Sequence, residues 1–370
     1  MNKDYSEHVS ALFSWYDANR RDLPWRSDRD PYKSWISEVM LQQTRVSTVI
    51  PYFNRFVQTY PDIPTLAVAN PDSVYKSWEG LGYYSRARNL IAGSRYIVEN
   101  HGGVFPRRKN EILCIPGIGP YIAAAILSMA FGDPEPSVDG NLIRVISRLH
   151  ALSGPADSGV TRKHITSLAR EMISDKRPGD FNEAMMDVGA TICTPKSPSC
   201  ETCPFQSLCL AARDGNWERY PGPKKSSSVP SVSLTICAVI LDGRVLIRKR
   251  PETGLLAGLY EFFSFPGHLS EAEALRAVFS SITLSNKTTA LVEALPKAQH
   301  RFSHLIWDMQ GYRVVLEKNR TGAPVCFSLS DADAETGCFH TPVDARKLAF
   351  PTALRVYTEA VLGLKHDVKE

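Results

Sequence analysis

Residues 113–123 read LCIPGIGPYIA, and this stretch decides the fold of the N-terminal half of the chain. The apolar run 122–131 that follows predicts a helix, and Pro120 suits the first turn of that helix. Gly117 and Gly119 permit positive φ angles and a close approach to the backbone. A helix N-terminus with free N–H groups binds anions such as phosphate. A plain helix–turn–helix connection with glycine caps uses the same residues, so the stretch alone leaves both interpretations open.

Helical spacing continues on both sides of this hairpin. Apolar residues recur at intervals of three and four, namely Trp35, Val39, Val46 and Ile50 before it and Leu142, Val145, Ile146 and Leu149 after it. The chain has 370 residues and 43% apolar residues, which is enough for two or three domains. We therefore expect an all-α N-terminal part.

The segment 213–233, RDGNWERYPGPKKSSSVPSVS, is typical of a linker between domains. It is rich in Pro, Gly, Ser and Lys and keeps no apolar period. Short β-rich runs follow it at 234–241, 245–247, 312–316 and 325–329. Asp242-Gly243 between the first two runs is a hairpin turn signal. These patterns predict an α+β C-terminal domain.

The N-terminal segment and the apolar runs of the chain predict a reducing compartment. The N-terminal MNKDYSEHVS has no apolar h-region, and no apolar run reaches the roughly 18 residues of a membrane span. We therefore expect a cytoplasmic protein without a membrane partner, in which eight cysteines serve a purpose other than disulfides. The net charge of +4 is compatible with a polyanionic partner but is weak evidence for one.

Four of the cysteines form a cluster in the sequence. Cys193, Cys200, Cys203 and Cys209 have the spacing C-x6-C-x2-C-x5-C, and their thiolates can close one metal site. Zinc sites usually have two short C-x2–4-C pairs, and this segment has one. The spacing therefore favours an iron–sulfur cluster over zinc, and cysteines without a metal are the third interpretation.

Two carboxylates are candidates for acid–base chemistry. Asp139 opens a predicted helix over 142–150, whose N-terminus favours the ionised carboxylate, although many such residues are simple N-caps. Glu38 lies in a predicted helix over 35–45. A carboxyl kept protonated beside one kept ionised is the arrangement for acid-assisted cleavage of a glycosidic bond.

Glu38 also has a second interpretation. It shares a predicted helix face with Gln42 and Arg45, at offsets of four and seven, as a surface glutamate in a polar row would. Its other neighbours are strongly apolar, so burial could raise its pKa.

Four motifs together resemble known DNA glycosylases. The cysteine spacing resembles the iron–sulfur loop of the endonuclease III family, and residues 113–123 resemble the helix-hairpin-helix motif of the same superfamily. The stretch 137–141, SVDGN, resembles the segment that carries the superfamily's aspartate. The stretch 37–44, SEVMLQQT, resembles a segment of adenine DNA glycosylases that remove adenine mispaired with 8-oxoguanine. The resemblance covers nearly the whole chain.

The resemblance implies a multidomain architecture. It comprises an all-α helix-hairpin-helix catalytic core over 1–215, a linker over 216–232 and a Nudix-like 8-oxoguanine-recognition domain over 233–364. Within the core it implies a six-helix barrel over about 23–134 and an iron–sulfur module over about 1–22 and 135–215. One 4Fe–4S cluster is the implied cofactor.

The same resemblance implies the roles of the reacting residues. Glu38 corresponds to the proton donor that makes adenine a leaving group, and Asp139 to the carboxylate that stabilises or captures the sugar cation. Asn141 matches a residue that helps to order this site. Tyr121 occupies the position where bifunctional relatives have a lysine, and a phenol cannot form a Schiff base. The implied reaction is therefore base removal without strand cleavage.

Other positions match residues that contact the DNA. The implied DNA-binding residues are Gln43, Tyr83, Arg86, Gly117 and Gly119. The implied adenine pocket consists of Trp25, Arg26, Leu41 and Glu183. The implied 8-oxoguanine-recognition loop consists of Phe302, Ser303 and His304. The implied partner is double-stranded DNA with an A:8-oxoguanine or A:G mismatch, bound by a monomer in the nucleoid of a bacterial cell.

Three alternatives remain. A mismatch thymine glycosylase can also carry a tyrosine at the hairpin, although SEVMLQQT and the C-terminal loop argue against it. A non-enzymatic, cluster-bearing DNA-binding regulator would not depend on Asp139. The stretch 254–262 resembles a Nudix fold, but the segment after Gly267 lacks the Arg-Glu-x-x-Glu-Glu set of a Nudix hydrolase, so a binding role fits better.

Overall fold

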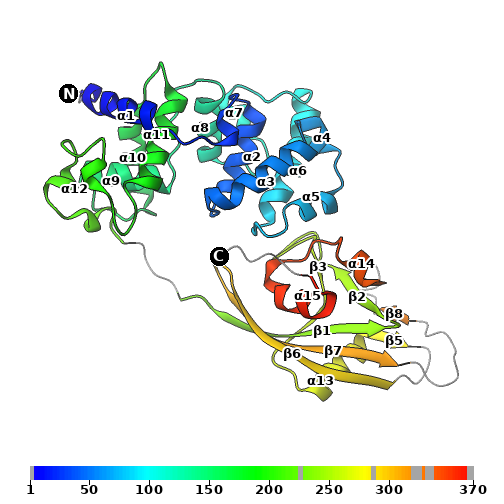
Figure 1. Ribbon diagram of the computed structural model, residues 1–370. Coiled ribbons are helices and arrows are strands. Elements are labelled where there is room, and N and C mark those ends of the chain that lie inside the picture. The colour runs from blue at the N-terminus through cyan, green and yellow to red at the C-terminus, as the bar shows by residue number, and fades with distance from the viewer. Residues whose placement is uncertain (1–3, 224–227, 285–288, 318–326, 330–336, 365–370) are drawn as a thin grey trace. The chain divides into compact units, whose positions relative to one another are not determined.

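The computed structural model describes residues 4–223, 228–284, 289–317, 327–329 and 337–364 (Figure 1). The chain separates into two compact units, one of residues 1–69 and 89–226 and one of residues 70–88 and 227–370. The domain boundaries expected from the sequence stay a prediction, and the segment 70–88, which they assign to the core, groups with the second unit. Among the described residues, no helix combines the length and the apolar character that crossing a membrane requires.

The first unit is helical, as the sequence predicts. Its α-helices are α1 (Ser6–Asn19), α2 (Pro31–Leu41), α3 (Val46–Thr59), α4 (Ile63–Ala67), α6 (Ser85–His101), α7 (Lys109–Ile112), α8 (Pro120–Met129), α9 (Gly140–Leu149), α10 (Gly159–Met172), α11 (Pro178–Thr191) and α12 (Leu210–Arg213). Short 3-10 helices are η1 (Pro24–Arg26), η2 (Cys200–Thr202) and η3 (Trp217–Arg219).

Helix ends follow capping chemistry. Asp30 caps α2 and is followed by Pro31 at the first helical position, a pairing that satisfies one free N–H and removes another. The helix predicted over 35–45 ends early, because α2 stops at Leu41 and Gln43 takes a left-handed backbone with φ of 57°. The expected polar row of Glu38 with Gln42 and Arg45 on one helix face is therefore wrong.

One core of the first unit joins the two ends of its sequence. Leu12 and Tyr16 from α1 are buried with Ile146 of α9 and Phe181 of α11. Figure 1 shows α1 beside α10 and α11. The cysteine loop packs on the edge of the same cluster through Phe205. This core therefore holds α9 and α11 in place under the cysteine loop.

The second unit is built on a mixed sheet. Its strands are β1 (Ser231–Leu241), β2 (Arg244–Lys249), β3 (Tyr260–Glu261), β4 (Phe263–Pro266), β6 (Thr289–Arg301), β7 (Ile306–Glu317) and β9 (Gly337–His340), in the order β3-β2-β1-β7-β6, with β4 pairing β1 and β9 pairing β2. β1 and β7 are parallel, and the other pairs are antiparallel. A separate pair joins β5 (Ile282–Leu284) to β8 (Phe327–Leu329). The helices are α5 (Pro71–Ser77), α13 (Glu271–Ser281), α14 (Pro342–Ala345) and α15 (Arg355–Leu362), with η4 (Thr352–Leu354).

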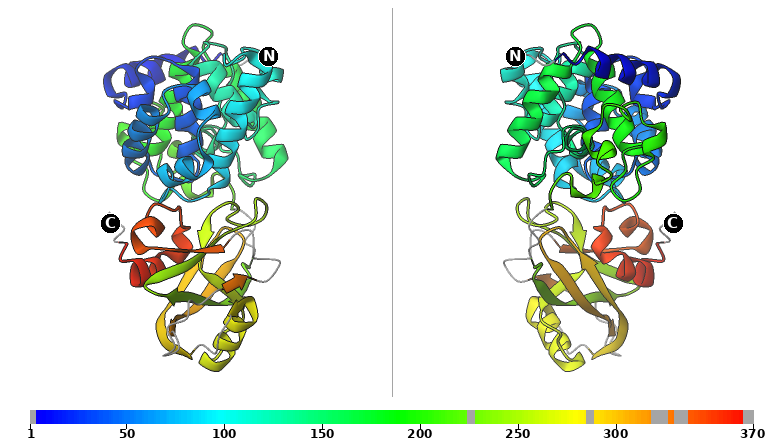
Figure 2. Two further views of the ribbon diagram at one scale, coloured as in Figure 1. Left: turned by 90° about the vertical axis from the view of Figure 1, so that its right-hand side faces the viewer. Right: turned by 90° about the vertical axis from the view of Figure 1, so that its left-hand side faces the viewer.

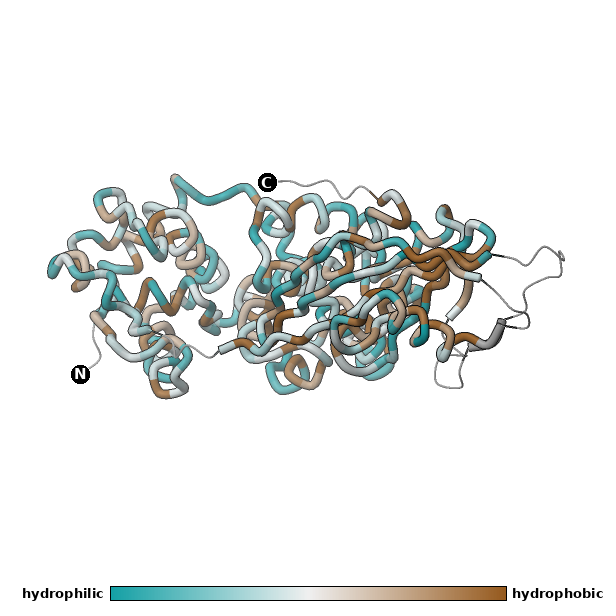
Figure 3. Tube along the Cα trace, turned by 90° about the horizontal axis from the view of Figure 1, so that it is seen from below, coloured by the Kyte–Doolittle hydropathy of each residue, from teal (hydrophilic) through white to brown (hydrophobic). Residues whose placement is uncertain are grey.

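Helices cover both faces of this sheet. Ile236 and Ala238 of β1 pack with α15, whereas Cys237 and Val239 pack with α13. Figures 1 and 2 show α15 and α13 on opposite sides of the strands. Burial on both faces explains the continuous apolar run from Ile236 to Leu241 in β1, and the strands are among the brown parts of the tube in Figure 3.

The predicted strands of the second unit are confirmed where the structure describes them. Asp242 and Gly243 have φ angles of 50° and 70°, the left-handed pair of a tight hairpin between β1 and β2. The run predicted over 325–329 is a strand from Phe327, and its first two residues lie outside the described residues.

Candidate active site

The hairpin over 113–123 connects α7 to α8. Gly117 has a φ of 82°, and a Cβ there would lie 2.5 Å from the Cβ of Asn89, so only glycine fits. Gly119 is the N-cap of α8 with φ of −95°, so Gly117 alone of these two glycines uses the positive φ that glycine permits. A Cβ on Gly119 would meet no atom within 4 Å, so the space beside this N-cap residue is open.

The carboxyl of Glu38 is buried at the centre of the first unit. The residue is 4% exposed, and the Tyr121 hydroxyl of α8 donates a hydrogen bond to its Oε2 at 2.5 Å. Burial raises the pKa of Glu38 to about 7, against the opposing hydrogen bond from Tyr121, and the charge of Asp139 raises it as well. The prediction that burial raises this pKa is therefore confirmed. Such a carboxyl holds and releases a proton near neutral pH.

Asp139 faces the same site from the N-terminus of α9. Its Oδ1 accepts a hydrogen bond from the Leu142 N–H at 2.7 Å, and its Oδ2 accepts one from Asn141 Nδ2 at 2.9 Å. Burial raises the pKa of Asp139, while these hydrogen bonds lower it. The helix end supports the carboxylate as predicted, but burial, which the sequence did not indicate here, has the larger effect.

A chain of hydrogen bonds links Asp139 to the cysteine loop. Asn141 Oδ1 accepts a hydrogen bond from Arg144 Nη2 at 2.9 Å. Arg144 Nε donates to the carbonyl oxygen of Cys193 at 2.7 Å, and Nη2 also donates to that of Gly189 at 2.6 Å. The carboxylate, α9, α11 and the first cysteine are therefore held as one assembly.

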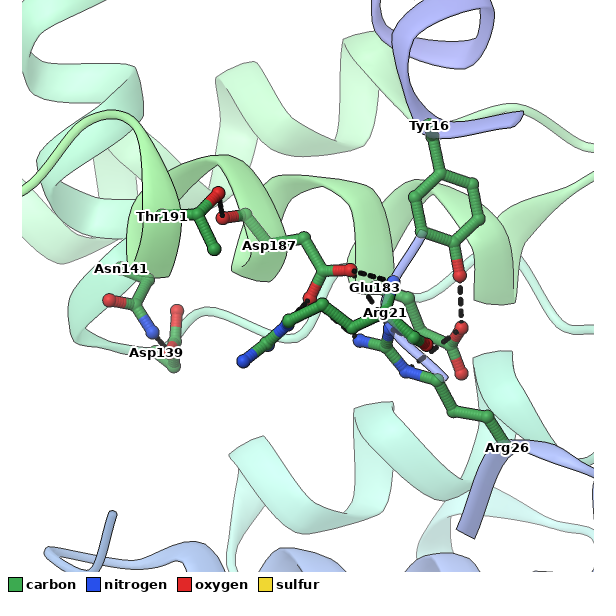
Figure 4. A network of polar contacts seen from close by, with 8 residues as sticks. All are labelled: Tyr16, Arg21, Arg26, Asp139, Asn141, Glu183, Asp187 and Thr191. Atoms are coloured by element: carbon green, nitrogen blue, oxygen red, sulfur yellow. Dashed lines mark hydrogen bonds and ion pairs between the residues drawn. The ribbon is translucent and has the colours of Figure 1, made fainter. Parts of the chain in front are cut away.

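Arg26 and Glu183 belong to a buried network that joins α1, η1 and α11 (Figure 4). Asp187 accepts two hydrogen bonds from the Arg26 guanidinium, both at 2.9 Å, and one from Arg21 Nε at 2.7 Å. Glu183 lies 3.3 Å from Arg26 Nε and accepts a hydrogen bond from the Tyr16 hydroxyl. The charges of Arg26 and Glu183 both act on Glu38, so this network forms part of the same site.

The pKa values of Asp187 and Glu183, which lie on neighbouring turns of α11, shift in opposite directions. Burial raises the pKa of Asp187, but the hydrogen bonds and charges of Arg26 and Arg21 outweigh it, so the net shift is downward. Burial raises the pKa of Glu183, and Arg26 opposes that shift. Tyr16, Arg21 and Asp187 were not predicted from the sequence. The sequence did contain one indication of the network, because Glu183 and Asp187 lie four residues apart in the apolar stretch 181–190, FNEAMMDVGA.

The other two predicted pocket residues lie at the ends of short elements. Trp25 of η1 is buried, and its ring packs edge-on against Phe53 with 5.3 Å between centroids. Leu41 is the last residue of α2 and is partly exposed. Whether these residues contact a base stays a prediction.

Two of the predicted DNA-contact residues, Gln43 and Tyr83, lie in turns with left-handed backbones. Gln43 is exposed after α2 in the first unit, and Tyr83, in the second unit, has φ of 48° and is 45% exposed. Arg86 is instead buried and donates hydrogen bonds to the carbonyl oxygens of Leu81 and Gly82, both at 3.0 Å. Its guanidinium also lies against the Tyr83 ring, 5.6 Å from its centroid. Arg86 therefore supports the turn that exposes Tyr83.

The loop between β6 and β7 presents two of its three predicted residues outward. Phe302 packs on Trp307, with ring centroids 5.1 Å apart, and its N–H donates to the Leu305 carbonyl oxygen at 2.8 Å. Ser303 and His304 are exposed. Together with Tyr83, the three residues line a cavity of about 410 Å³ within the second unit. Phe302 thus orders the loop, and the polar side chains are available for contacts.

The four clustered cysteines line one cavity with Arg148 and Trp217. All four are free thiols, and Arg148 Nη1 donates to Cys193 Sγ at 3.3 Å. Burial and the neighbouring thiolates raise the pKa of Cys203 to about 12, and those of Cys200 and Cys209 also rise. A cationic group shared by the four sulfurs would remove this repulsion. In the described part of the chain, no group of three or more His, Cys, Asp or Glu side chains is placed to hold a metal ion. Four thiols around one cavity are a donor set that suits an iron–sulfur cluster.

Family models match most of the chain. The model of the HhH-GPD superfamily base excision DNA repair protein matches residues 36–171, and the iron-sulfur binding domain of endonuclease III matches residues 193–209. The NUDIX domain matches residues 235–360. The predicted fold, a helix-hairpin-helix core with an iron–sulfur motif and a Nudix-like domain, is thereby confirmed.

Individual relatives agree with these models. The chain is 37% identical to an adenine DNA glycosylase of Mus musculus, over 85% of this chain and 72% of that protein. It is 34% identical to an adenine DNA glycosylase of Buchnera aphidicola subsp. Acyrthosiphon pisum (strain APS), over 80% of this chain and 83% of that protein. A solved thermostable thymine-DNA glycosylase superposes with a TM-score of 0.53 at 31% identity, over 57% of this chain and 100% of that chain. The chain therefore belongs to the adenine DNA glycosylase family within the HhH-GPD superfamily of base excision DNA repair proteins.

Proposed function

We propose that the protein is a monofunctional DNA glycosylase that flips out and removes adenine opposite 8-oxoguanine or guanine and leaves an abasic site. The observation that carries this proposal is the buried Glu38 carboxyl, hydrogen bonded to Tyr121 and close enough to Asp139 for their charges to interact. One carboxyl poised to give a proton and another at a helix N-terminus are the two groups that this cleavage needs.

The reaction begins with proton transfer from Glu38 to N7 of a flipped adenine. The C1′–N9 bond then breaks, its electron pair leaves with the base, and the base departs neutral. The deoxyribose is left as an oxocarbenium ion. Asp139 stabilises or captures this cation, and Asn141 and the Leu142 N–H hold its carboxylate in place. Water adds at C1′ and loses a proton, which restores the acid form of Glu38.

Tyr121 excludes the lyase step on chemical grounds. A strand-cleaving glycosylase needs an amine that forms a Schiff base with the sugar, and the phenol has none. Burial raises the pKa of Tyr121 well above its ordinary value, so the hydroxyl stays protonated and donates to Glu38. Its proposed task is to position and tune the acid.

Separate surfaces support recognition of the mismatch. The N-terminus of α8 at Gly119, where the space is open, suits a DNA phosphate. Gln43 and Tyr83 are suited to insert beside an unstacked base. Ser303 and His304 offer exposed polar groups to the edge of 8-oxoguanine. The segment after Gly267 forms α13, where Glu273 is engaged in a capping box with Ser270. We therefore assign the Nudix-like unit a binding role.

The four cysteines are proposed to hold one 4Fe–4S cluster. Cys193, Cys200, Cys203 and Cys209 would supply one thiolate to each iron, and Arg148 would donate a hydrogen bond to the Cys193 sulfur. The cluster would supply redox chemistry and a fixed anchor for the loop. Base removal itself needs only the carboxyls and Tyr121.

The decisive experiment incubates excess protein with a duplex that holds one central adenine opposite 8-oxoguanine. Free adenine is detected by mass, and strand breaks are measured before and after hot alkali. We expect adenine release with breaks only after alkali. Breaks without alkali would contradict the role of Tyr121. No adenine from protein with an intact cluster would redirect the search to thymine mismatches, as the similarity to a thymine-DNA glycosylase suggests, and then to binding without catalysis.

A further inference from the structure

Asp139 stands at the end of a long segment that is neither helix nor strand. Residues 130–139 connect α8, which carries Tyr121, to α9, which Asp139 caps. The position of the Asp139 carboxylate relative to Glu38 therefore depends on how this segment is held. Its side-chain ion pairs, Lys109 and Arg170 to Glu135, are partly exposed and contribute little.

Asn182 of α11 is the buried group that holds the segment. Its side chain is 0% exposed, and its Oδ1 accepts a hydrogen bond from the Ser137 N–H at 2.9 Å. Its Nδ2 donates to the Glu135 carbonyl oxygen at 2.9 Å and to Ser128 Oγ on α8 at 2.7 Å. One amide thus connects α11, the end of α8 and the segment two residues before Asp139.

The chemistry of these three partners suits asparagine in particular. The site offers one donor and two acceptors, and a carboxamide supplies one acceptor and two donors. An aspartate would face the Glu135 carbonyl without a donor, and an aliphatic residue would leave all three groups unpaired, which is costly in a buried place. The fit therefore fixes both the residue type and the orientation of the amide.

Close helix contacts leave α11 no freedom to compensate for a change. A Cβ on Gly179 would lie 2.9 Å from the Ser128 carbonyl oxygen, and a Cβ on Gly189 would lie 2.5 Å from the Asn141 Cβ. α11 is thus seated against α8 at one end and against the neighbour of Asp139 at the other. Asn182 lies between these contacts and next to Glu183.

We propose that Asn182 is a positioning residue that sets the Asp139 carboxylate opposite the Glu38 acid, an inference that rests on the function proposed above. It acts through the backbone of residues 135–137 and touches neither the base nor the sugar. A displacement of about 1 Å in such a group costs roughly 100-fold in rate, so the effect should be large although the residue is remote from the reacting atoms.

Two serines form a matched pair for the test. Ser128 and Ser94 are both 0% exposed helical serines whose hydroxyls donate to the carbonyl oxygen four residues earlier at 2.8 Å. Of the two, Ser128 also accepts from Asn182. Ser128→Ala therefore removes one bond of the proposed network, and Ser94→Ala removes a comparable bond elsewhere in the first unit.

The experiment measures single-turnover adenine release per active molecule in the full-length holoprotein. In parallel, it measures affinity for two uncleavable duplexes, one with a cationic pyrrolidine and one with a neutral tetrahydrofuran in place of the target sugar. The pyrrolidine cation mimics the charge that Asp139 faces in the transition state. The affinity of the protein for the cationic duplex therefore depends on whether the Asp139 carboxylate is correctly positioned. Far-UV circular dichroism and the visible absorption of the cluster establish that each variant is folded.

We expect Asn182→Ala to lower release roughly 100-fold and affinity for the cationic duplex by a similar factor, with the neutral duplex bound as before. Ser128→Ala should lower release roughly fivefold, and Ser94→Ala should leave it unchanged. Unchanged release by folded Asn182→Ala, or equal loss of affinity for both duplexes, would overturn the inference. If Asn182→Ala does not fold, equal rates for the two serine variants would overturn it. Failure of the proposed function is distinct, because the wild-type protein would then release no adenine.

Discussion

Glu38 and Asp187 are both buried in the first unit, but their carboxyls carry opposite pKa shifts. Glu38 is 4% exposed and Asp187 is 0% exposed, yet the pKa of Glu38 rises to about 7 and that of Asp187 falls. Glu38 meets a phenol and the like charge of Asp139, whereas Asp187 meets the guanidinium groups of Arg21 and Arg26. Burial makes a carboxyl sensitive to its surroundings, and the partner decides the direction of the shift. One carboxyl can therefore hold a proton for transfer while the other holds an arginine in place.

The largest effect is expected for Glu38→Gln. An amide keeps the shape of the side chain but cannot transfer a proton, so release of adenine should fall about 1000-fold, within the range of general acid catalysis. Binding of the mismatch duplex should persist, as measured by titration of a labelled duplex. Glu99→Gln, on the exposed side of α6, serves as the control and should match the wild type. Release at the wild-type rate by Glu38→Gln would contradict the assignment of Glu38 as the proton donor.

Asp187→Asn tests whether the Asp187 carboxylate holds its two arginine partners in place. Two arginines then lose their shared counter-charge in a buried place, which should lower the free energy of unfolding by about 3 kcal/mol. Urea denaturation measures the change. Asp17→Asn disrupts an ion pair with Arg177 at the surface and should have no measurable effect. Equal stability of the two variants would show that the arginine pair is not held by Asp187.

The pH dependence of adenine release tests the raised pKa of Glu38. The reactive form has Glu38 protonated and Asp139 ionised, so release should fall about tenfold per pH unit above pH about 7. Release should also fall at acidic pH, where Asp139 becomes protonated, and burial raises the pKa of this carboxyl above its ordinary value. Tyr121→Phe should move this midpoint upward, because the lost hydrogen bond stabilised the carboxylate. Tyr32→Phe, which alters a buried phenol elsewhere on α2, should leave the midpoint in place. A downward shift in Tyr121→Phe would contradict the role of the phenol.

The smallest effect concerns discrimination by the second unit. Ser303→Ala should reduce the preference for 8-oxoguanine over guanine opposite adenine about fivefold, the contribution of one hydrogen bond. The measurement is the ratio of single-turnover rates on the two duplexes. Ser280→Ala, an exposed serine of α13, is the matched control. An unchanged ratio in Ser303→Ala would remove this hydroxyl from recognition.

Features encoded by neighbouring residues could be predicted from the sequence. The helix after Pro120, the cap at Asp139 and the turn at Asp242-Gly243 each depend on contacts within a few residues, and the structure contains all three. The burial of Glu38 could be predicted because its helix, α2, carries apolar residues on several sides.

Features set by distant partners could not be predicted. Nothing near Asp187 indicates that Arg21 and Arg26 reach it from more than 160 residues away, or that Asn182 bonds to Ser137. The end of α2 was placed too late because the left-handed backbone at Gln43 has no glycine to mark it. Local chemistry and the resemblance to known glycosylases therefore indicated the candidate reacting groups, and long-range packing determined how these groups are held.

The contacts of α1 and η1 with α11 also determine when the candidate site can form during synthesis. The Tyr16–Glu183 and Arg26–Asp187 contacts span 167 and 161 residues, so they close very long loops. The helices that carry Glu38 and Tyr121 leave the ribosome long before α11. A nascent chain thus contains the proton donor before it contains the network that holds Arg26 and Glu183. If Arg26 and Glu183 line the base pocket as proposed, that pocket is completed last, and the ability to hold a base is a late product of folding.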